Sequence, residues 1–64
     1  MAKFKKFVTC FESYIEDGIK FWTSGCVYPA IHHRDGSWSV VTNFGTIGAM
    51  WTSDEFYEHF TTNN

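Results

Sequence analysis

The chain fills its apolar positions with aromatic and β-branched residues and contains no leucine. Seven phenylalanines, three tyrosines and three tryptophans make up 20% of its 64 residues. Valine, isoleucine, threonine and the aromatic residues favour the pleated surface of a sheet, whereas leucine is one of the stronger helix formers. The composition therefore predicts an all-β protein, and a chain of this length is expected to form a single domain over 1–64.

The charge balance makes nucleic acid a second-choice partner. Five Lys and Arg residues stand against seven Asp and Glu residues, which gives a formal charge of −2. Binding to phosphates without regard to sequence needs several basic side chains on one face. A protein is therefore expected to be the partner.

No stretch of the sequence approaches the roughly 18 apolar residues of a membrane span, and the residues before Phe11 are too few and too polar for a signal sequence. We therefore expect a cytoplasmic protein without a membrane partner. Thiols stay reduced in that compartment. Cys10 and Cys26 are accordingly predicted to be free, buried thiols that behave as small hydrophobic side chains.

Alternation and turn residues predict where the strands lie in the first half of the chain. One strand is expected over 4–11 and a short one over 19–22, with an irregular connection or a wide hairpin between them. The next strand is expected over 26–33 and contains Pro29. Because proline has no N–H, we expect an edge or a bulge at that point.

A meander is predicted after this strand. Asp35-Gly36 is a hairpin turn signal, and the segment 43–45 forms a second tight turn. Strands are expected over 37–42, where apolar and polar residues alternate, and over 46–51. Three consecutive antiparallel strands joined by short turns result.

The last part of the chain carries a helix start signal. Thr52 and Glu55 have capping-box spacing, and Phe56 and Phe60 are four residues apart, so that one helical turn can lay both rings across an open end of the sheet. The polar residues 61–64 are expected to fray. Most of the core is predicted to come from Trp38, Val40, Ile47, Ala49, Val27, Ile31, Phe56 and Phe60.

The order and spacing of these signals resemble a known family. A pattern of Gly-x-Val-Tyr, a strand, Asp-Gly, an aromatic strand and a glycine-containing turn runs through 23–31, 35–40 and 43–48, and is followed by Trp51 and Phe56. It is similar to the small SH3-like β-barrel accessory proteins of tailed phages and prophages. The resemblance implies an antiparallel barrel of about five strands with a short C-terminal helical turn, encoded by a phage and acting in the host cytoplasm.

No metal site or cofactor is expected from the potential ligands. They are His32, His33, His59, Cys10 and Cys26. Adjacent residues of a strand point to opposite faces, so His32 and His33 do not share an ion without a bulge. The paired ligand spacings typical of structural zinc sites are missing from the sequence.

Catalysis is also not expected. Cys10 with a histidine, or Ser53 with His59 and Asp54, has only the composition of a nucleophile with a base. Ligand cavities usually reach roughly 300 Å³ or more, and a small filled barrel offers little concavity. The chain is therefore predicted not to be an enzyme.

Large apolar side chains crowd the connection over 14–22. Either this segment folds back as a barrel strand and closes the core, or part of it forms a protein-binding patch of the aromatic kind found at binding hot spots. We predict an accessory protein that binds a host protein and inhibits or modulates it. The predicted partner-binding residues are Phe7, Tyr14, Phe21 and Trp22.

Two alternatives remain open. The same aromatic residues are suitable as stacking platforms for a nucleic acid. The phosphate contacts would then come from Lys3, Lys5, Lys6, Lys20 and Arg34. A minor structural phage protein is the other alternative, self-associating through an exposed strand edge. The chain is expected to be a monomer or a homodimer.

Overall fold

The alternating segments of the sequence form short strands. The computed structural model describes residues 6–63, which form six strands and one helix. They are β1 (Lys6–Cys10), β2 (Tyr14–Glu16), β3 (Ile19–Trp22), β4 (Val27–His32), β5 (Trp38–Val40), α1 (Ser53–Tyr57) and β6 (Phe60–Asn63). The predicted mainly β character is confirmed. Positions 4 and 5 of the predicted first strand, Lys3 and Asn64 lie outside the described residues.

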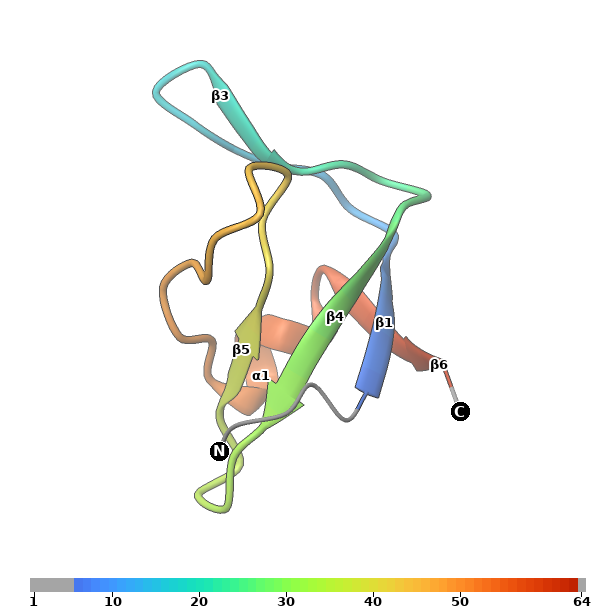
Figure 1. The fold of residues 1–64 in the computed structure, drawn as a ribbon, viewed down its shortest axis with the longest axis vertical. Helices are drawn as coiled ribbons and strands as arrows, with labels where there is room; N and C mark the ends of the chain where they lie inside the picture. Colours follow the sequence, from blue (N-terminus) through green and yellow to red (C-terminus); the bar gives the residue numbers. More distant parts are fainter. Residues whose placement is uncertain (1–5, 64) are drawn as a thin grey trace.

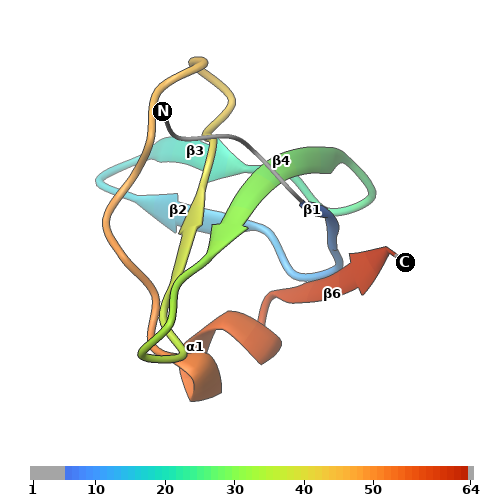
Figure 2. The same ribbon diagram turned by 60° about the horizontal axis from the view of Figure 1, so that its bottom comes forward.

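The strands pair in two antiparallel sheets. Four of them form one sheet in the order β5-β4-β1-β6, and β2 pairs with β3 in a separate hairpin. Figure 1 shows β4 and β1 side by side, with the β3 end of the hairpin projecting beyond them. Turned by 60°, the molecule shows α1 at the bottom, leading into the edge strand β6 (Figure 2).

Strand β4 faces the core with Tyr28 and Ala30, whereas the sequence predicted Val27 and Ile31 there. Val27 is 53% exposed and Ile31 is half-buried. The pairing of Val8 with Tyr28 fixes the register between β1 and β4. Because side chains alternate along a strand, a shift of one residue moves every side chain to the other face. The strand was therefore placed correctly, but its buried face was wrong.

Pro29 lies in an inner strand without a bulge in its pairing with β1, but it falls just beyond the last ladder pair with β5, Ala30 with Val40, so the predicted edge is present on that side alone. Strand β4 runs between β5 and β1, and its register through Pro29 is continuous. The Val41 N–H donates to the Pro29 carbonyl at 3.1 Å. A regular antiparallel pair would return a bond to the Val41 carbonyl. That oxygen instead accepts the indole N–H of Trp22 at 2.9 Å, so the missing proline donor leaves no unpaired acceptor.

The core centres on stacked aromatic rings. The ring of Trp38 lies between those of His32 and Phe56, with centroid distances of 4.1 and 4.0 Å and nearly parallel planes. Phe56 in turn stacks on Phe60 at 5.2 Å. The predicted burial of Trp38, Val40, Phe56 and Phe60 is confirmed. The predicted burial of Cys10 is confirmed as well, and the other buried hydrophobic residues outside the predicted core list are Val8, Trp22, Tyr28, Ala30 and Trp51.

Both predicted tight turns are confirmed. The His33 N–H donates to the Ser37 carbonyl at 2.8 Å across the first turn, and the Thr42 N–H donates to the Thr46 carbonyl at 2.8 Å across the second. The φ angle of Gly36 in the first turn is 95°. Residues with a side chain are strained there, which explains the Asp-Gly signal.

The predicted strand over 46–51 does not form. Only isolated bridges join this segment to its neighbours, and both Ile47 and Ala49 are exposed. The chain passes close over an indole ring, because a Cβ atom added to Gly48 would lie 2.7 Å from the Cη2 atom of Trp22. The glycine therefore permits close approach, and the segment follows the ring rather than the sheet.

The helix start is confirmed, but the helix is not the last element. The Thr52 side chain accepts the Glu55 N–H at 3.3 Å, as the capping spacing predicted. The expected fraying is wrong for 61–63, which pair with β1 in β6. There the Thr9 hydroxyl donates to the Asn63 side chain at 2.9 Å. This pairing covers an edge of β1 that would otherwise expose unpaired backbone groups.

The two cysteines are free, as expected, but only Cys10 is buried, and Cys26 is exposed. Burial raises the pKa of the Cys10 thiol, and its Sγ donates to the Glu12 carbonyl at 3.2 Å. The thiolate is the reactive form. One thiol should therefore react much more slowly than the other.

We expect one equivalent of a thiol reagent such as dithionitrobenzoate to react quickly with the native protein. The second equivalent should react only when urea unfolds the chain, since Cys10 is then exposed. The release of thionitrobenzoate at 412 nm measures both phases. A Cys26→Ser variant, as the control, should lose the fast phase alone; two equally fast thiols in the native protein would contradict the burial of Cys10.

Candidate functional site

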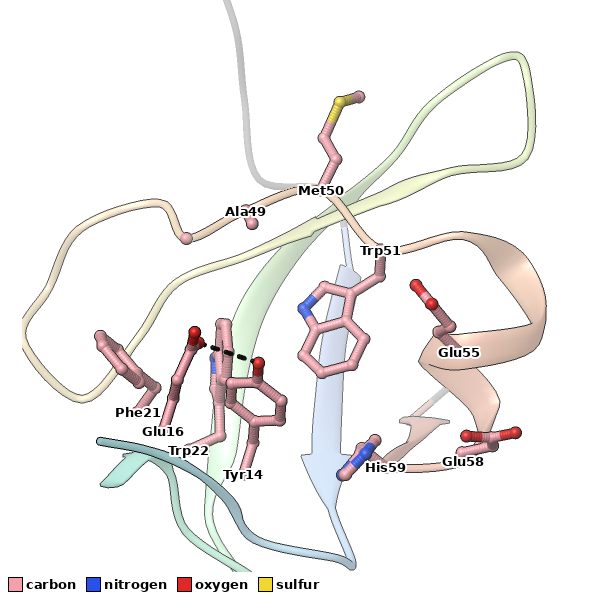
Figure 3. A pocket seen from close by; sticks show the side chains of 11 residues that line it. Tyr14, Glu16, Phe21, Trp22, Ala49, Met50, Trp51, Glu55, Glu58 and His59 are labelled. Atoms are coloured by element: carbon pink, nitrogen blue, oxygen red, sulfur yellow. Dashed lines mark hydrogen bonds between the residues drawn. The ribbon is translucent and has the colours of Figure 1, made fainter. Parts of the chain in front are cut away.

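An open cavity of about 500 Å³ lies between the β2–β3 hairpin, the segment 48–51 and α1 (Figure 3). We call it the groove. The lining residues are Tyr14, Glu16, Phe21, Trp22, Gly48, Ala49, Met50, Trp51, Glu55, Glu58 and His59. The expectation of little concavity is wrong. It considered only the interior of a filled barrel, whereas this cavity forms where the hairpin stands beside the helix.

Aromatic rings form the wall of the groove. The ring of Tyr14 meets those of Trp22 and Trp51 edge to face, with centroid distances of 5.7 and 5.3 Å. It also contacts His59 at 5.7 Å. Such geometry is favourable between aromatic rings. Tyr14 is thus fixed from both sides of the groove.

Asn43 holds the hairpin side of the groove in place. Its backbone N–H donates to the Phe21 carbonyl at 2.8 Å, and its side-chain amide donates to the Lys20 carbonyl at 3.1 Å. The Tyr28 hydroxyl donates to the Asn43 side-chain oxygen at 2.5 Å. The turn that follows β5 therefore anchors β3 to the core.

His59 fixes the helix side. The Phe11 N–H donates to the His59 carbonyl at 2.8 Å, and the His59 Nδ1 atom lies 2.9 Å from the Glu12 carbonyl. A carbonyl only accepts, so Nδ1 carries the proton in this contact. These bonds join the end of α1 to the end of β1, directly before the β2–β3 hairpin begins.

Three carboxylates surround the aromatic wall: Glu16 on β2, Glu55 in α1 and Glu58 at its C-cap. The Tyr14 hydroxyl donates to Glu16, two residues along β2, at 3.0 Å, and Figure 3 shows this bond on the hairpin side of the groove. The hydrogen bond to Glu16 is the main cause that raises the pKa of Tyr14, and the negative charges of Glu16 and Glu55 add to it. The described lining residues include no Lys or Arg, so the groove is negatively charged.

Trp51 brings an unpaired donor to the groove. Its side chain is only 8% exposed, and its indole N–H finds no acceptor among residues 6–63. In Figure 3 the nitrogen lies on the edge of the ring turned toward Tyr14 and Glu16. A buried donor without a partner costs roughly 1–3 kcal/mol. An acceptor from a bound molecule would remove that cost.

The structure brings three of the four predicted partner-binding residues together. Tyr14, Phe21 and Trp22 all line the groove. Phe7 does not line it: it is exposed on the outer face of β1, opposite Pro29. Trp22 belongs to the core, as expected if the segment 14–22 closes the core. Tyr14 and Phe21 pack against that core but are only half-buried, so they remain available for a binding patch.

The acidic residues and Trp51 were missed. Glu55 belongs to the capping signal and Glu58 follows it, and neither was predicted as a site residue. Their spacing of three residues was the available signal, since such residues share one face of a helix. No local pattern places that face beside Glu16, because β6 has to pair with β1 first.

A second polar cluster lies away from the groove. The His33 Nε2 atom is 2.7 Å from the hydroxyl of Ser39, a buried residue. The Asp35 carboxylate accepts the N–H and the hydroxyl of Ser37, and these bonds lower the pKa of Asp35. Asp35 thus serves the turn and does not orient the histidine, which leaves a pair without the third group of a catalytic triad.

Protein-family models, curated proteins and solved structures were compared with the chain, and none of them matches it. Within residues 6–63, no three His, Cys, Asp or Glu side chains are grouped so that they could hold a metal ion. In the same part of the chain, no helix is long and apolar enough to cross a bilayer. The groove is therefore the feature from which a function is inferred.

Proposed function

We propose that the chain is a noncatalytic binding domain that takes up part of a host protein in the groove and thereby inhibits or modulates that protein in the host cytoplasm. The observation that carries this proposal is the groove, an open cavity of about 500 Å³ with an aromatic wall. Tyrosine and tryptophan in concave, well-packed sites are typical of binding hot spots. The phage context, and with it the host as the source of the partner, comes from the sequence resemblance.

We also propose that the strands close into an SH3-like barrel. The strand order β5-β4-β1-β6 supports this, together with the hairpin between β1 and β4 and the short helix before β6. Bridges from Val41 to Ile47 and from Trp38 to Trp51 continue the order beyond β5. The segment 46–51 then takes the place of a further strand, and the groove lies on the outside of the barrel.

The chemistry of the groove supports a noncatalytic role. Its described lining contains no serine, threonine or cysteine that could act as a nucleophile. The hydrogen bond to Glu16 raises the pKa of Tyr14, which makes that phenol harder to ionise than an ordinary tyrosine. The pair formed by the half-buried His33 and the buried Ser39 does not belong to the groove. The groove thus offers no hydroxyl or thiol nucleophile beside its aromatic wall, and we assign its carboxylates to binding.

The same groove favours protein over nucleic acid as the partner. Its carboxylates repel phosphates, and neither Lys20 nor Arg34 lines it. The aromatic rings of the groove thus lie beside carboxylates and away from these two basic side chains. This agrees with the net negative charge of the whole chain.

The proposal is tested by filling the groove. Ala49 is exposed and lines the groove, whereas Ile47 is exposed on the same segment and does not line it. An Ala49→Trp variant should block the groove whatever its ligand is, and Ile47→Trp is the matched control. Each tagged chain is used to capture proteins from a nuclease-treated bacterial lysate, and mass spectrometry compares what is retained.

We expect one stoichiometric host protein to be retained by the native chain and by Ile47→Trp, and to be lost with Ala49→Trp. The purified partner should bind with the same order of affinities in calorimetry. Equal retention by all three chains would contradict the groove as the site. If no lysate protein is retained and the chain binds DNA or RNA tightly and in a salt-sensitive way, the nucleic-acid alternative would be favoured.

A further inference from the structure

The charges and donors of the groove indicate which chemical group it accepts. We infer that the groove binds a peptide segment of the partner protein, with a positively charged arginine or lysine side chain entering between Glu16 and the acidic residues of α1. This inference rests on the proposed function, because it names the ligand of the same groove. It is carried by three observations: the carboxylates, the aromatic wall and the unpaired indole N–H.

The carboxylates define the sign of the ligand. Glu16 approaches from the hairpin, and Glu55 and Glu58 approach from the helix, so the negative charges lie on two sides of one cavity. No Lys or Arg among the described lining residues neutralises them. The hydrogen bond to Glu16 is the main cause that raises the pKa of Tyr14, and the charges of Glu16 and Glu55 raise it further. A cation in this position is attracted by both sides at once.

The aromatic wall suits the same group. Cations are attracted to the faces of tryptophan and tyrosine rings, and an arginine guanidinium also stacks on them. The rings of Tyr14 and Trp51 stand edge to face at an angle of 77°. Rings at this angle form a corner in which a long basic side chain packs its methylene groups while its charged end reaches the carboxylates.

The indole N–H of Trp51 identifies the cation as part of a peptide. An ammonium or guanidinium group has no acceptor, so a free cation would leave this donor unpaired. A main-chain carbonyl beside the basic residue would accept it. The N–H of Trp22, by contrast, already donates to Val41 at 2.9 Å. A peptide therefore satisfies both the carboxylates and the unpaired donor.

The test uses two synthetic peptides that differ only in charge. Both are capped nonapeptides of glycine, alanine and serine, one with a central arginine and the other with citrulline, which keeps the shape and loses the charge. Each is titrated into the 15N-labelled chain and followed by nuclear magnetic resonance. The indole signal of Trp51, assigned by its loss in Trp51→Phe, reports the hydrogen bond.

We expect the arginine peptide to bind with a dissociation constant in the range of about 1 mM and to move the Trp51 indole proton downfield. The citrulline peptide should bind about tenfold more weakly, as expected for a desolvated cation on aromatic rings and carboxylates. Affinity for the arginine peptide should fall with added salt.

Variants of the helix give a matched control for the site. Glu55→Gln and Glu58→Gln should each lower the affinity for the arginine peptide about threefold or more. Asp54 is exposed on the same helix but does not line the groove, so Asp54→Asn should bind normally. None of these variants should change the melting temperature by more than a few degrees, because all three residues are exposed.

Equal binding of the two peptides would overturn the inference. So would a Trp51 signal that never moves, or an Asp54→Asn variant as weak as the two glutamine variants. If neither peptide binds while Ala49→Trp still loses the captured protein, the inference of a basic ligand is wrong and the proposed function stands. If the arginine peptide binds as expected while Ala49→Trp retains the captured protein, the charge preference stands and the proposed docking site is wrong.

Discussion

Replacing Trp38 with alanine is expected to lower the free energy of unfolding by about 3–5 kcal/mol. Trp38 is 1% exposed and lies between the rings of His32 and Phe56, so its loss leaves a large cavity in the stack. At roughly 0.05–0.15 kcal/mol per residue, the loss is comparable with the whole stability of a chain of this length. Far-ultraviolet circular dichroism and urea unfolding should show a largely unfolded variant.

Two control variants distinguish the loss of the ring stack from the loss of any aromatic ring. Phe44 is exposed, and Phe44→Ala should unfold close to the urea midpoint of the native chain. Trp38→Phe should lose much less than Trp38→Ala. It keeps a ring in the stack and removes an indole N–H that has no acceptor within residues 6–63. A Trp38→Ala variant with the native urea midpoint would show that the stack is not the centre of the core.

Replacing Trp22 with alanine is expected to be almost as severe. Trp22 is 3% exposed, its N–H donates to Val41, and its ring packs against Trp51 and Phe60. Its loss should cost about 3–5 kcal/mol. At about 4–8 °C for each kcal/mol, the melting temperature should fall by more than about 10 °C.

Phe21→Ala is the matched comparison, because Phe21 is the neighbouring residue and only half-buried. Phe21→Ala should lower the free energy of unfolding by roughly 1 kcal/mol. It should also weaken binding to the captured partner, since Phe21 lines the groove. Differential scanning fluorimetry and calorimetry with the partner give the two effects separately. Equal losses of stability in both variants would mean that the whole segment 14–22 is core, and stable Trp22→Ala would mean that it is all surface.

Features that depend on neighbouring residues were predictable from the sequence. The two tight turns follow from the dihedral preference of glycine at Gly36 and Gly45, and the helix start follows from the spacing of Thr52 and Glu55. The short strand over 19–22 was placed correctly for the same reason. The signal for each of these features lies within a few residues of chain.

Features that depend on distant residues were not predictable. The buried face of β4 is decided by its pairing with β1, and neither β4 nor β1 carries a pattern that fixes this register alone. The strand expected over 46–51 alternates correctly, but it gives way to the ring of Trp22 under Gly48. The groove depends on both effects, because it needs the hairpin, this segment and α1 to meet. Three of its residues were predicted as an aromatic surplus, whereas its charge was not recognised.

Pro29 in β4 is coupled to Trp22 in β3, although the two residues belong to different sheets. A residue with an N–H at position 29 would bring a second donor to the Val41 carbonyl, which Trp22 already occupies. Two donors would then compete for one oxygen, and the indole would have to tilt or share it. In variants of this sequence, Pro29 and Trp22 should therefore change together. A double-mutant cycle between the two positions should give a nonzero coupling energy, because both act on the Val41 carbonyl.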